Sequence, residues 1–345
     1  MLRLNFMASL VASLLCGLAV AAPPDGHYRL TSIDAPGGSV TDPAGLNDRG
    51  EVVGSVQGPN GPRAFLWRDG TFTDLAPLIA PDSPFTSAVA INNRSQVVGD
   101  FIDEQSTFRS YRLSRGTVTV LAFVPGESAT FVHDINDRGQ IIADTVDAQF
   151  STRSVLLDRH GAITFLDPFP GAVSASVNDV NDRGVVVGSN NTQAEQRAVL
   201  WENGAITDLG IPQSSARSIN NRGEIVGFKQ AGSGTGLRAF LWDDGNFIEL
   251  PLLEPLAQST TAFAINNGGA AVGTTVLGNS SSVATLWEQG AVFNLNDLIL
   301  ATDPLARRVK LESGALINDR GQVVARGRDS RSANVIRAYL LTPTH

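Results

Sequence analysis

Cysteine is almost absent from this chain: there is one residue, Cys16, in 345. A disulfide framework is therefore excluded. Cys16 lies in an N-terminal segment with Arg3 near its start, an apolar run over residues 6–20 and small residues at 19–22. This pattern predicts a signal peptide over residues 1–22 and a single domain over residues 23–345. A lipid-modified Cys16 is the alternative reading, but bulky Leu15 stands where a small residue is expected.

Basic residues are in the minority, with 26 Lys and Arg against 34 Asp and Glu, which gives a net charge of −8. This balance argues against nucleic acid as the partner, because binding to phosphates favours a basic surface. No segment after residue 22 is apolar over 18 residues, so no further membrane span is predicted. We expect a secreted monomer, either extracellular or periplasmic.

Residues with recognisable chemistry are also scarce. The four histidines are scattered, and no metalloprotease, phosphate-loop, nucleophile-elbow or dinucleotide-binding motif occurs. Asn-Asp-Arg-Gly runs contain oxygen ligands, but a calcium loop of the EF-hand type also needs alternating carboxylates and a distal Glu. We therefore expect no metal and no cofactor, and no catalytic residue is assigned.

One short phrase is abundant. An apolar residue, Asn, then Asp or Asn, a spacer, usually Gly, and a hydrophobic pair recur seven times. The copies begin at Asn47, Asn92, Asn136, Asn181, Asn220, Asn266 and Asn318, with spacings of 45, 44, 45, 39, 46 and 52 residues. A period near 45 built from short strands is typical of propeller blades.

Each copy contains signals for four strands. In the fifth copy, residues 215–219 alternate in polarity, and Asn220 can bond its own backbone two residues on while Gly223 accepts a positive φ. Residues 224–227 and 238–242 follow as strands, and the Asp-Asp-Gly turn leads into 246–250. The sequence therefore predicts an all-β, seven-bladed β-propeller of four-stranded antiparallel blades.

The third strand of each copy has a recurring composition. Six of the seven copies begin it with Arg: Arg63, Arg109, Arg153, Arg197, Arg238 and Arg337. We expect these arginines to pair with acids such as Asp74, Asp208 or Glu249, although a ring of anion-binding groups is the alternative. All four tryptophans share one repeat position, which predicts burial between blades for Trp67, Trp201, Trp242 and Trp287.

The ends of the chain complement each other. The seventh copy stops after its third strand at residues 337–341, whereas residues 27–33 form a strand-like segment before the first copy. We expect the N-terminal strand to complete the last blade and so close the ring, because closure removes exposed strand edges.

The phrase Ile-Asn-Asp-x-Gly-x-Val-Val-Gly together with Arg-Ala-Phe-Leu-Trp resembles the HAF-type probable extracellular repeat family. Arg stands here where that family has His, and the resemblance covers nearly all of residues 28–341. It implies a secreted or surface protein, and it implies no set of site residues.

Candidate ligand-binding residues are found where the inner strands deviate from one another. At two repeat positions, three and two residues before the turn Asn, most copies have small or apolar residues. Copies three to five are polar there, and the candidates are His133, Asp134, Asn178, Asp179 and Arg217. Consecutive blades would bring them together at the channel, where they could bind a polar ligand or perform acid–base chemistry. Polar lining of a water-filled channel is the alternative.

Two classes of function remain. The first is a secreted binding or scaffold propeller with an unknown extracellular ligand, a carbohydrate or a protein. The alternative is an extracellular carbohydrate-active enzyme, a hydrolase or lyase, that uses the polar channel residues of blades three to five. Loops over residues 55–62, 100–108, 228–237 and 294–314 vary between copies and share one face with the inter-blade segments, where recognition usually occurs.

Overall fold

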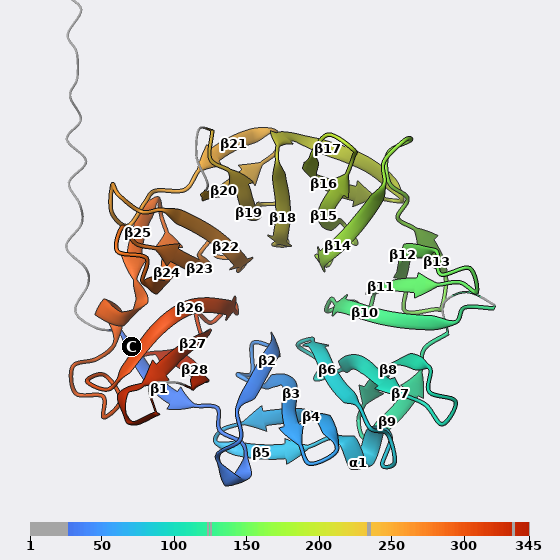
Figure 1. The fold of residues 1–345 in the computed structure, drawn as a ribbon, viewed down its shortest axis with the longest axis horizontal. Helices are drawn as coiled ribbons and strands as arrows, with labels where there is room; N and C mark the ends of the chain where they lie inside the picture. Colours follow the sequence, from blue (N-terminus) through green and yellow to red (C-terminus); the bar gives the residue numbers. More distant parts are fainter. Residues whose placement is uncertain (1–26, 123, 125, 233–235, 333–334, 345) are drawn as a thin grey trace, which may run out of the picture.

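Seven four-stranded antiparallel sheets stand around a central channel in the computed structural model. The structure describes residues 27–344 except 123, 125, 233–235 and 333–334, so the expected signal peptide lies outside the described residues. Figure 1 views the ring along the channel, with the first strand of each repeat innermost. The seven-bladed propeller predicted from the repeats is confirmed.

The blades follow one another in chain order. Blades one to three are β2 (Thr41–Leu46), β3 (Val52–Gly58), β4 (Gly61–Arg68), β5 (Thr71–Asp74); β6 (Thr86–Ile91), β7 (Val97–Ile102), β8 (Phe108–Ser114), β9 (Thr117–Val120); β10 (Ala129–Ile135), β11 (Ile141–Val146), β12 (Thr152–Leu157), β13 (Ile163–Phe165). Blades four to six are β14 (Ser174–Val180), β15 (Val186–Asn191), β16 (Gln196–Glu202), β17 (Ala205–Pro212); β18 (Ser214–Ile219), β19 (Ile225–Gln230), β20 (Leu237–Asp243), β21 (Asn246–Glu249); β22 (Ser259–Ile265), β23 (Ala271–Val276), β24 (Ser282–Glu288), β25 (Ala291–Asn294). Blade seven is β26 (Val309–Ile317), β27 (Val323–Asp329), β28 (Ile336–Pro343) and β1 (Tyr28–Ser32).

Helical segments among the described residues are short: α1 (Ala76–Ile79) and the 3-10 turns η1 (Pro36–Gly38), η2 (Leu295–Leu298) and η3 (Ser330–Ser332). None of the described helices is long and apolar enough to cross a bilayer.

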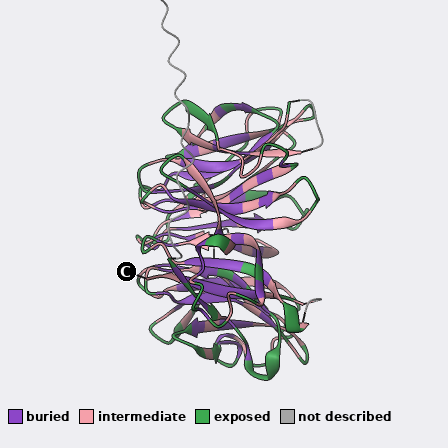
Figure 2. Cartoon of the chain, turned by 90° about the vertical axis from the view of Figure 1, so that its left-hand side faces the viewer, coloured by how far each residue is buried: buried purple, intermediate pink, exposed green. Residues whose placement is uncertain are grey.

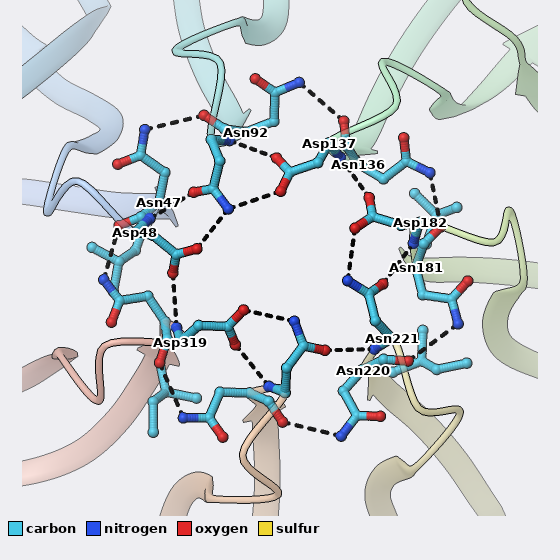
Figure 3. A pocket seen from close by; sticks show the side chains of 18 of the residues that line it. Asn47, Asp48, Asn92, Asn136, Asp137, Asn181, Asp182, Asn220, Asn221 and Asp319 are labelled. Atoms are coloured by element: carbon cyan, nitrogen blue, oxygen red, sulfur yellow. Dashed lines mark hydrogen bonds between the residues drawn. The ribbon is translucent and has the colours of Figure 1, made fainter.

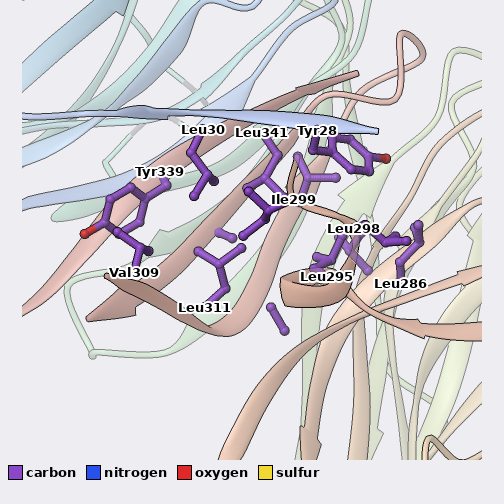
Figure 4. Close-up of a cluster of buried hydrophobic side chains, with 14 of the residues drawn as sticks. Tyr28, Leu30, Leu286, Leu295, Leu298, Ile299, Val309, Leu311, Tyr339 and Leu341 are labelled. Carbon is purple, nitrogen blue, oxygen red and sulfur yellow. The ribbon is translucent and has the colours of Figure 1, made fainter. Parts of the chain in front are cut away.

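The N-terminal strand closes the ring as predicted. β1 pairs antiparallel with β28, with Leu30 opposite Leu341. Figure 4 shows the core at this seam, where Leu30 is 7% exposed and Leu295 and Leu298 of η2 pack nearby. The expectation that 294–314 is a variable loop was therefore wrong in part, because this segment contains η2 and the first half of β26.

Burial is concentrated between neighbouring blades, where Figure 2 shows buried residues along the strands and exposed residues in the connections. Trp67, Trp201 and Trp287 are at most 3% exposed, as predicted. The linker that precedes each blade covers its tryptophan, and Trp201 and Trp287 donate their indole N–H to linker carbonyls at 2.9 and 2.8 Å.

Trp242 is the exception, because its side chain is partly exposed. A single residue, Gln213, separates β17 from β18, so no linker is available to cover this ring. The 39-residue spacing between the fourth and fifth copies is the shortest in the chain and marks the missing linker. Trp242 still packs against the core between the blades, but it is less buried than the other three tryptophans.

The six recurring arginines each pair with an acid, so the structural interpretation holds. The N–O distances are 2.8 Å for Arg63–Asp74, 3.0 Å for Arg109–Asp103, 2.9 Å for Arg153–Asp167, 2.6 Å for Arg197–Asp208, 3.9 Å for Arg238–Glu249 and 3.1 Å for Arg337–Asp34. Such partly exposed pairs contribute little to stability individually.

The first Asn of each phrase links its own turn to the next blade. In blade four, Asn181 Oδ1 accepts from the backbone N–H of Arg183 at 3.0 Å and of Val185 at 3.1 Å, which forms the predicted turn. Its Nδ2 donates to the carbonyl of Asn220 in blade five at 3.1 Å. The same inter-blade bond occurs at all seven junctions, with lengths of 2.8–3.1 Å, and returns from Asn318 to Asn47.

A second ring lies beside the first. It is formed by the residue that directly follows the turn Asn in each blade. The side-chain oxygen of this residue accepts a hydrogen bond from the backbone N–H of the equivalent residue in the preceding blade. Its members are Asp48, Asn93, Asp137, Asp182, Asn221, Asn267 and Asp319, with bonds of 2.6–2.9 Å. Figure 3 shows both rings around a cavity of about 180 Å³. The turn residues therefore link neighbouring blades in addition to forming the turns.

We expect Leu30→Ala to lower the unfolding free energy by roughly 2–5 kcal/mol, because a buried leucine of the closing strand leaves a cavity. The matched control is Thr31→Ala, which changes an exposed neighbour on the same strand. Urea titration followed by tryptophan fluorescence measures both. Equal midpoints for the two variants would mean that β1 does not hold the ring closed.

The two roles of Asn181 can be separated. Asn181→Asp keeps the oxygen that forms the turn but places a carboxylate against the Asn220 carbonyl, so we expect a loss of about 1–3 kcal/mol at pH 7. At pH 4 a protonated Asp can donate to that carbonyl again, and thermal melting should show a smaller loss. Asn181→Ala removes both roles and should stay destabilised at both pH values. An Asn181→Asp protein as stable as the parent at pH 7 would contradict the inter-blade role.

Candidate functional site

Each of the seven inner strands carries a β-bulge three residues before the turn Asn. The residues left out of register are Ala44, Val89, His133, Asn178, Arg217, Phe263 and Ala315. In a regular strand, neighbouring residues point to opposite faces. A bulge changes the local direction of the strand, so the side chains of this residue and of the next can both point into the same cavity.

The channel beneath the turn face holds a cavity of about 320 Å³. All five candidate residues line it, so the structure brings together the positions chosen from the sequence: His133, Asp134, Asn178, Asp179 and Arg217. The remaining blades contribute a mostly apolar wall that includes Val89, Phe263 and Leu316. The cavity is therefore polar on one side and apolar on the other.

His133 faces two carboxyl groups that are not among the candidates. Its Nε2 lies 2.9 Å from Asp144 Oδ2, and Asp144 Oδ1 accepts from Ser154 Oγ at 2.6 Å. Burial alone would raise the pKa of Asp144, but the hydrogen bonds from His133 and Ser154 and the charge of His133 bring it below its usual value. Asp144 thus orients the imidazole.

The second carboxyl group, Asp100, is 7% exposed. Its Oδ1 accepts from Ser110 Oγ at 2.7 Å and from the Val132 N–H at 3.1 Å. Burial raises the pKa of Asp100 to about 6, and these hydrogen bonds and the charge of His133 reduce that rise. A proton is therefore held next to the imidazole in mildly acidic solution.

Asp134 and Asp179 form a separate pair. Burial raises the pKa of Asp134 well above its usual range, and the negative charge of Asp179 and the hydrogen bond between the two carboxyl groups raise it further. Both also bind backbone of the following blade, because Asp134 Oδ2 accepts from the Val180 N–H at 3.2 Å and Asp179 Oδ2 from the Ile219 N–H at 2.8 Å. These two carboxyl groups therefore link blades in addition to lining the cavity.

Arg217 lies on the inner strand β18 and differs from the recurring arginines of the third strands, which pair with acids. Its guanidinium makes no hydrogen bond or ion pair with any residue in the described ranges, and burial lowers its pKa. Asn178 Nδ2 beside it donates to the Ala216 carbonyl at 2.6 Å. Both side chains also line a second cavity of about 370 Å³, whose wall includes Arg326. Arg326 pairs with Asp42 at 2.5 Å, so Arg217 is the cation available to a ligand here.

Sequence reasoning found the inner-strand residues but missed Asp100 and Asp144. These occupy one repeat position on the second strand, directly after the small residue. The other copies have Ser55, Ser189, Phe228, Thr274 and Arg326 there. Comparison of the copies at this position would have singled out two acids in adjacent blades, flanking His133.

The described residues contain no group of three or more His, Cys, Asp or Glu side chains that could hold a metal ion. The polar side of the cavity is lined by one histidine, two carboxyl groups, one amide and one guanidinium: His133, Asp134, Asp179, Asn178 and Arg217.

No protein-family model and no curated protein matches this chain. Solved structures do align with it. Virginiamycin B lyase from Staphylococcus aureus, as a catalytically inactive variant with quinupristin, gives a TM-score of 0.55 at 13% identity over 91% of this chain and 99% of that one. The β-propeller domain of the Trilobed protease from Pyrococcus furiosus, described as having an open velcro topology, gives 0.56 at 10% identity over 92% and 97%.

The acylaminoacyl peptidase of Pyrococcus horikoshii gives a TM-score of 0.56 at 14% identity over 89% of this chain and 52% of that one. At such identities the similarity shows the propeller fold alone.

The proton on Asp100 can be detected as a pH dependence of stability. A folded-state pKa near 6, above an unfolded value near 4, means that this group's stabilising contribution is complete below pH 4 and lost as the pH rises through 6. Asp100→Asn mimics the protonated form. Its stability relative to the parent should therefore improve by about 2 kcal/mol from pH 4 to pH 7. Urea titrations at the two pH values measure this, and a constant difference would contradict it.

Proposed function

We propose that this chain is an exported member of the HAF-type extracellular repeat proteins and acts as a binding propeller. Its ligand is a small acidic sugar, such as a hexuronate, held in the central channel. The observation that carries this proposal is Arg217, a guanidinium with no partner among the described residues that lines the channel cavity. An anion is the group that such a cation binds most strongly.

The surroundings of Arg217 favour a sugar as the carrier of that anion. Asn178, Asp179 and His133 offer acceptors and donors for hydroxyl groups on the polar side. Phe263 offers an apolar surface for the C–H face of a ring on the other side. A cavity of about 320 Å³ has room for one or two sugar rings. Export agrees with the N-terminal pattern over residues 1–22, since extracellular space is where such glycans occur.

Arg217→Gln tests the binding role cleanly, because this side chain is exposed to the channel and has no structural partner in the described part of the chain. We expect calorimetry to show binding of D-galacturonate to the parent. The variant should lose at least tenfold in affinity, about 1.4 kcal/mol. D-galactose, the neutral counterpart, should bind weakly and equally to both proteins. Equal affinity of the two proteins for galacturonate would remove Arg217 from the site.

An extracellular lyase is the second candidate, favoured by the His133–Asp144 pair. A carboxylate-oriented imidazole is a typical general base. With the sugar carboxylate neutralised by Arg217, His133 would take the proton at C5, the C4–O bond would break, and a C4–C5 double bond would form. The leaving oxygen would be protonated in turn.

Hydrolysis fits less well, because its two carboxylates must lie about 5 Å or more apart, whereas Asp134 and Asp179 share a hydrogen bond. Incubation with an oligogalacturonide separates the two candidate functions. Ultraviolet absorbance from the unsaturated product, lost in His133→Gln, would establish the lyase. Binding without product would leave the propeller as a binding protein.

A further inference from the structure

A second site lies between the first two blades, apart from the channel. Here a groove of about 750 Å³ is bordered by turns of both blades. Figure 1 shows α1 at this junction, between β5 and β9. The groove is the largest of the cavities described here, exceeding the channel cavity of about 320 Å³.

Four arginines line this groove: Arg49, Arg68, Arg94 and Arg115. The positive charge of Arg68 is neutralised by an ion pair with the fully buried Glu51. Arg49 donates to the neutral Ser95 Oγ at 3.1 Å. Arg94 and Arg115 are exposed, and their guanidinium groups make no hydrogen bond or ion pair in the described part of the chain. Three positive charges are thus available on a chain whose net charge is −8.

The floor between these arginines is aliphatic. Leu75, Ile91, Val97 and Leu113 are buried beneath it, Leu66 is partly buried, and Leu78 is 48% exposed. A ligand that fills the groove therefore needs both negative charge and branched apolar groups. An aromatic floor, on which sugars or bases would stack, is absent from the lining residues.

The charges on the rest of the turn face further restrict the class of ligand that this groove can bind. The turns between third and fourth strands carry a net charge of about +1 in blades one to three, from Arg68, Asp69, Arg115, Asp158 and Arg159. In blades four to six they carry only the acids Glu202, Asp243, Asp244 and Glu288. An anionic membrane or a nucleic acid lying across this face would meet the acidic half and be repelled. A short chain segment can enter the basic groove without touching the acidic half.

We propose that this groove binds an acidic peptide segment of a partner protein, in which carboxylates alternate with leucine-like side chains. Carboxylates would pair with Arg94 and Arg115 at the rim, and an apolar side chain would cover Leu66 and Leu78. The exposed charge pairs would speed association and determine which peptides bind, whereas the buried apolar contact would supply most of the binding free energy. This site is independent of the channel and of its proposed sugar ligand.

Three labelled peptides test the proposal by fluorescence anisotropy: acetyl-Glu-Leu-Glu-Leu-Glu, its serine counterpart with Glu-Ser alternation, and its lysine counterpart. We expect the first to bind at least tenfold more tightly than either of the others, and its affinity to fall as salt is added. Failure of the first peptide to bind at millimolar concentration, or equal binding of all three, would overturn the proposal.

Matched variants locate the site. Arg94→Glu with Arg115→Glu should abolish binding, and Leu78→Ser should weaken it at least fivefold while leaving the melting temperature unchanged. The control carries the same charge change on the same face: Arg183→Glu with Arg320→Glu, two exposed arginines that do not line the groove. Equal losses in both double variants would indicate a general charge effect and refute the groove.

A second copy of this chain is the competing occupant, because the hairpin at Asp243 and Asp244 is acidic and the neighbouring Phe247 and Ile248 are 42% and 50% exposed. Sedimentation of the unliganded protein distinguishes the two. A concentration-dependent dimer that Arg94→Glu with Arg115→Glu dissolves would assign the groove to self-association and overturn the peptide proposal. A monomer that binds the peptide supports it.

Discussion

The fold depends on one side chain used seven times, the asparagine that begins each turn. A buried amide must satisfy both of its ends, and here the oxygen accepts from its own turn while the nitrogen donates to the next blade. Asp could form the turn but could not donate, so the first position is Asn in every copy. At the following position the side-chain oxygen accepts a backbone N–H, which Asp and Asn can both do, as at Asp182 and Asn221. The asparagines there also donate to a neighbouring carboxylate, as Asn221 does to Asp182 at 2.6 Å. The chemistry of the two rings thus explains why one position of the phrase is invariant and the next is not.

The rings also turn a linear repeat into a cooperative unit. The bond from Asn318 to Asn47 spans 271 residues, and the pairing of β1 with β28 closes the same junction at the outer edge. Each blade is therefore held at both its inner turn and its flanks, and no disulfide is required. The second ring has a cost, because Asp48 and Asp319 are neighbours in it. Burial, together with the charges of Asp319 and Asp137, raises the pKa of Asp48 despite its hydrogen bonds to Asp319 and Asn93.

The repeats were sufficient to predict the fold, because equivalent positions in one chain report equivalent environments. Strand number, ring closure and the pairing of the six arginines all followed from that equivalence. The equivalence is incomplete at Trp242, because a linker shortened to Gln213 leaves this tryptophan less covered than the other three. It also missed Asp100 and Asp144, which reach His133 only through contacts across strands and blades. The arginine groove depends in the same way on how two blades pack, so the single residues Arg94 and Arg115 gave no sign of it.

Repeat positions that hold the same residue type in all blades form the contacts that assemble the ring. Repeat positions that differ over several consecutive blades are not required for those contacts, so they can vary without disrupting the ring. The first such block of positions is formed by the polar inner-strand residues in blades three to five. The turn-face arginines Arg68, Arg115 and Arg159 also gather in blades one to three, although they do not share one repeat position. The first block carries a structural cost, because Asp134 and Asp179 bring two acids together in a buried place. Their bonds to the Val180 and Ile219 N–H groups offset part of it and tie these residues to blade assembly. Arg217 has no such second role, because its guanidinium lines the channel cavity and makes no hydrogen bond or ion pair within the described residues.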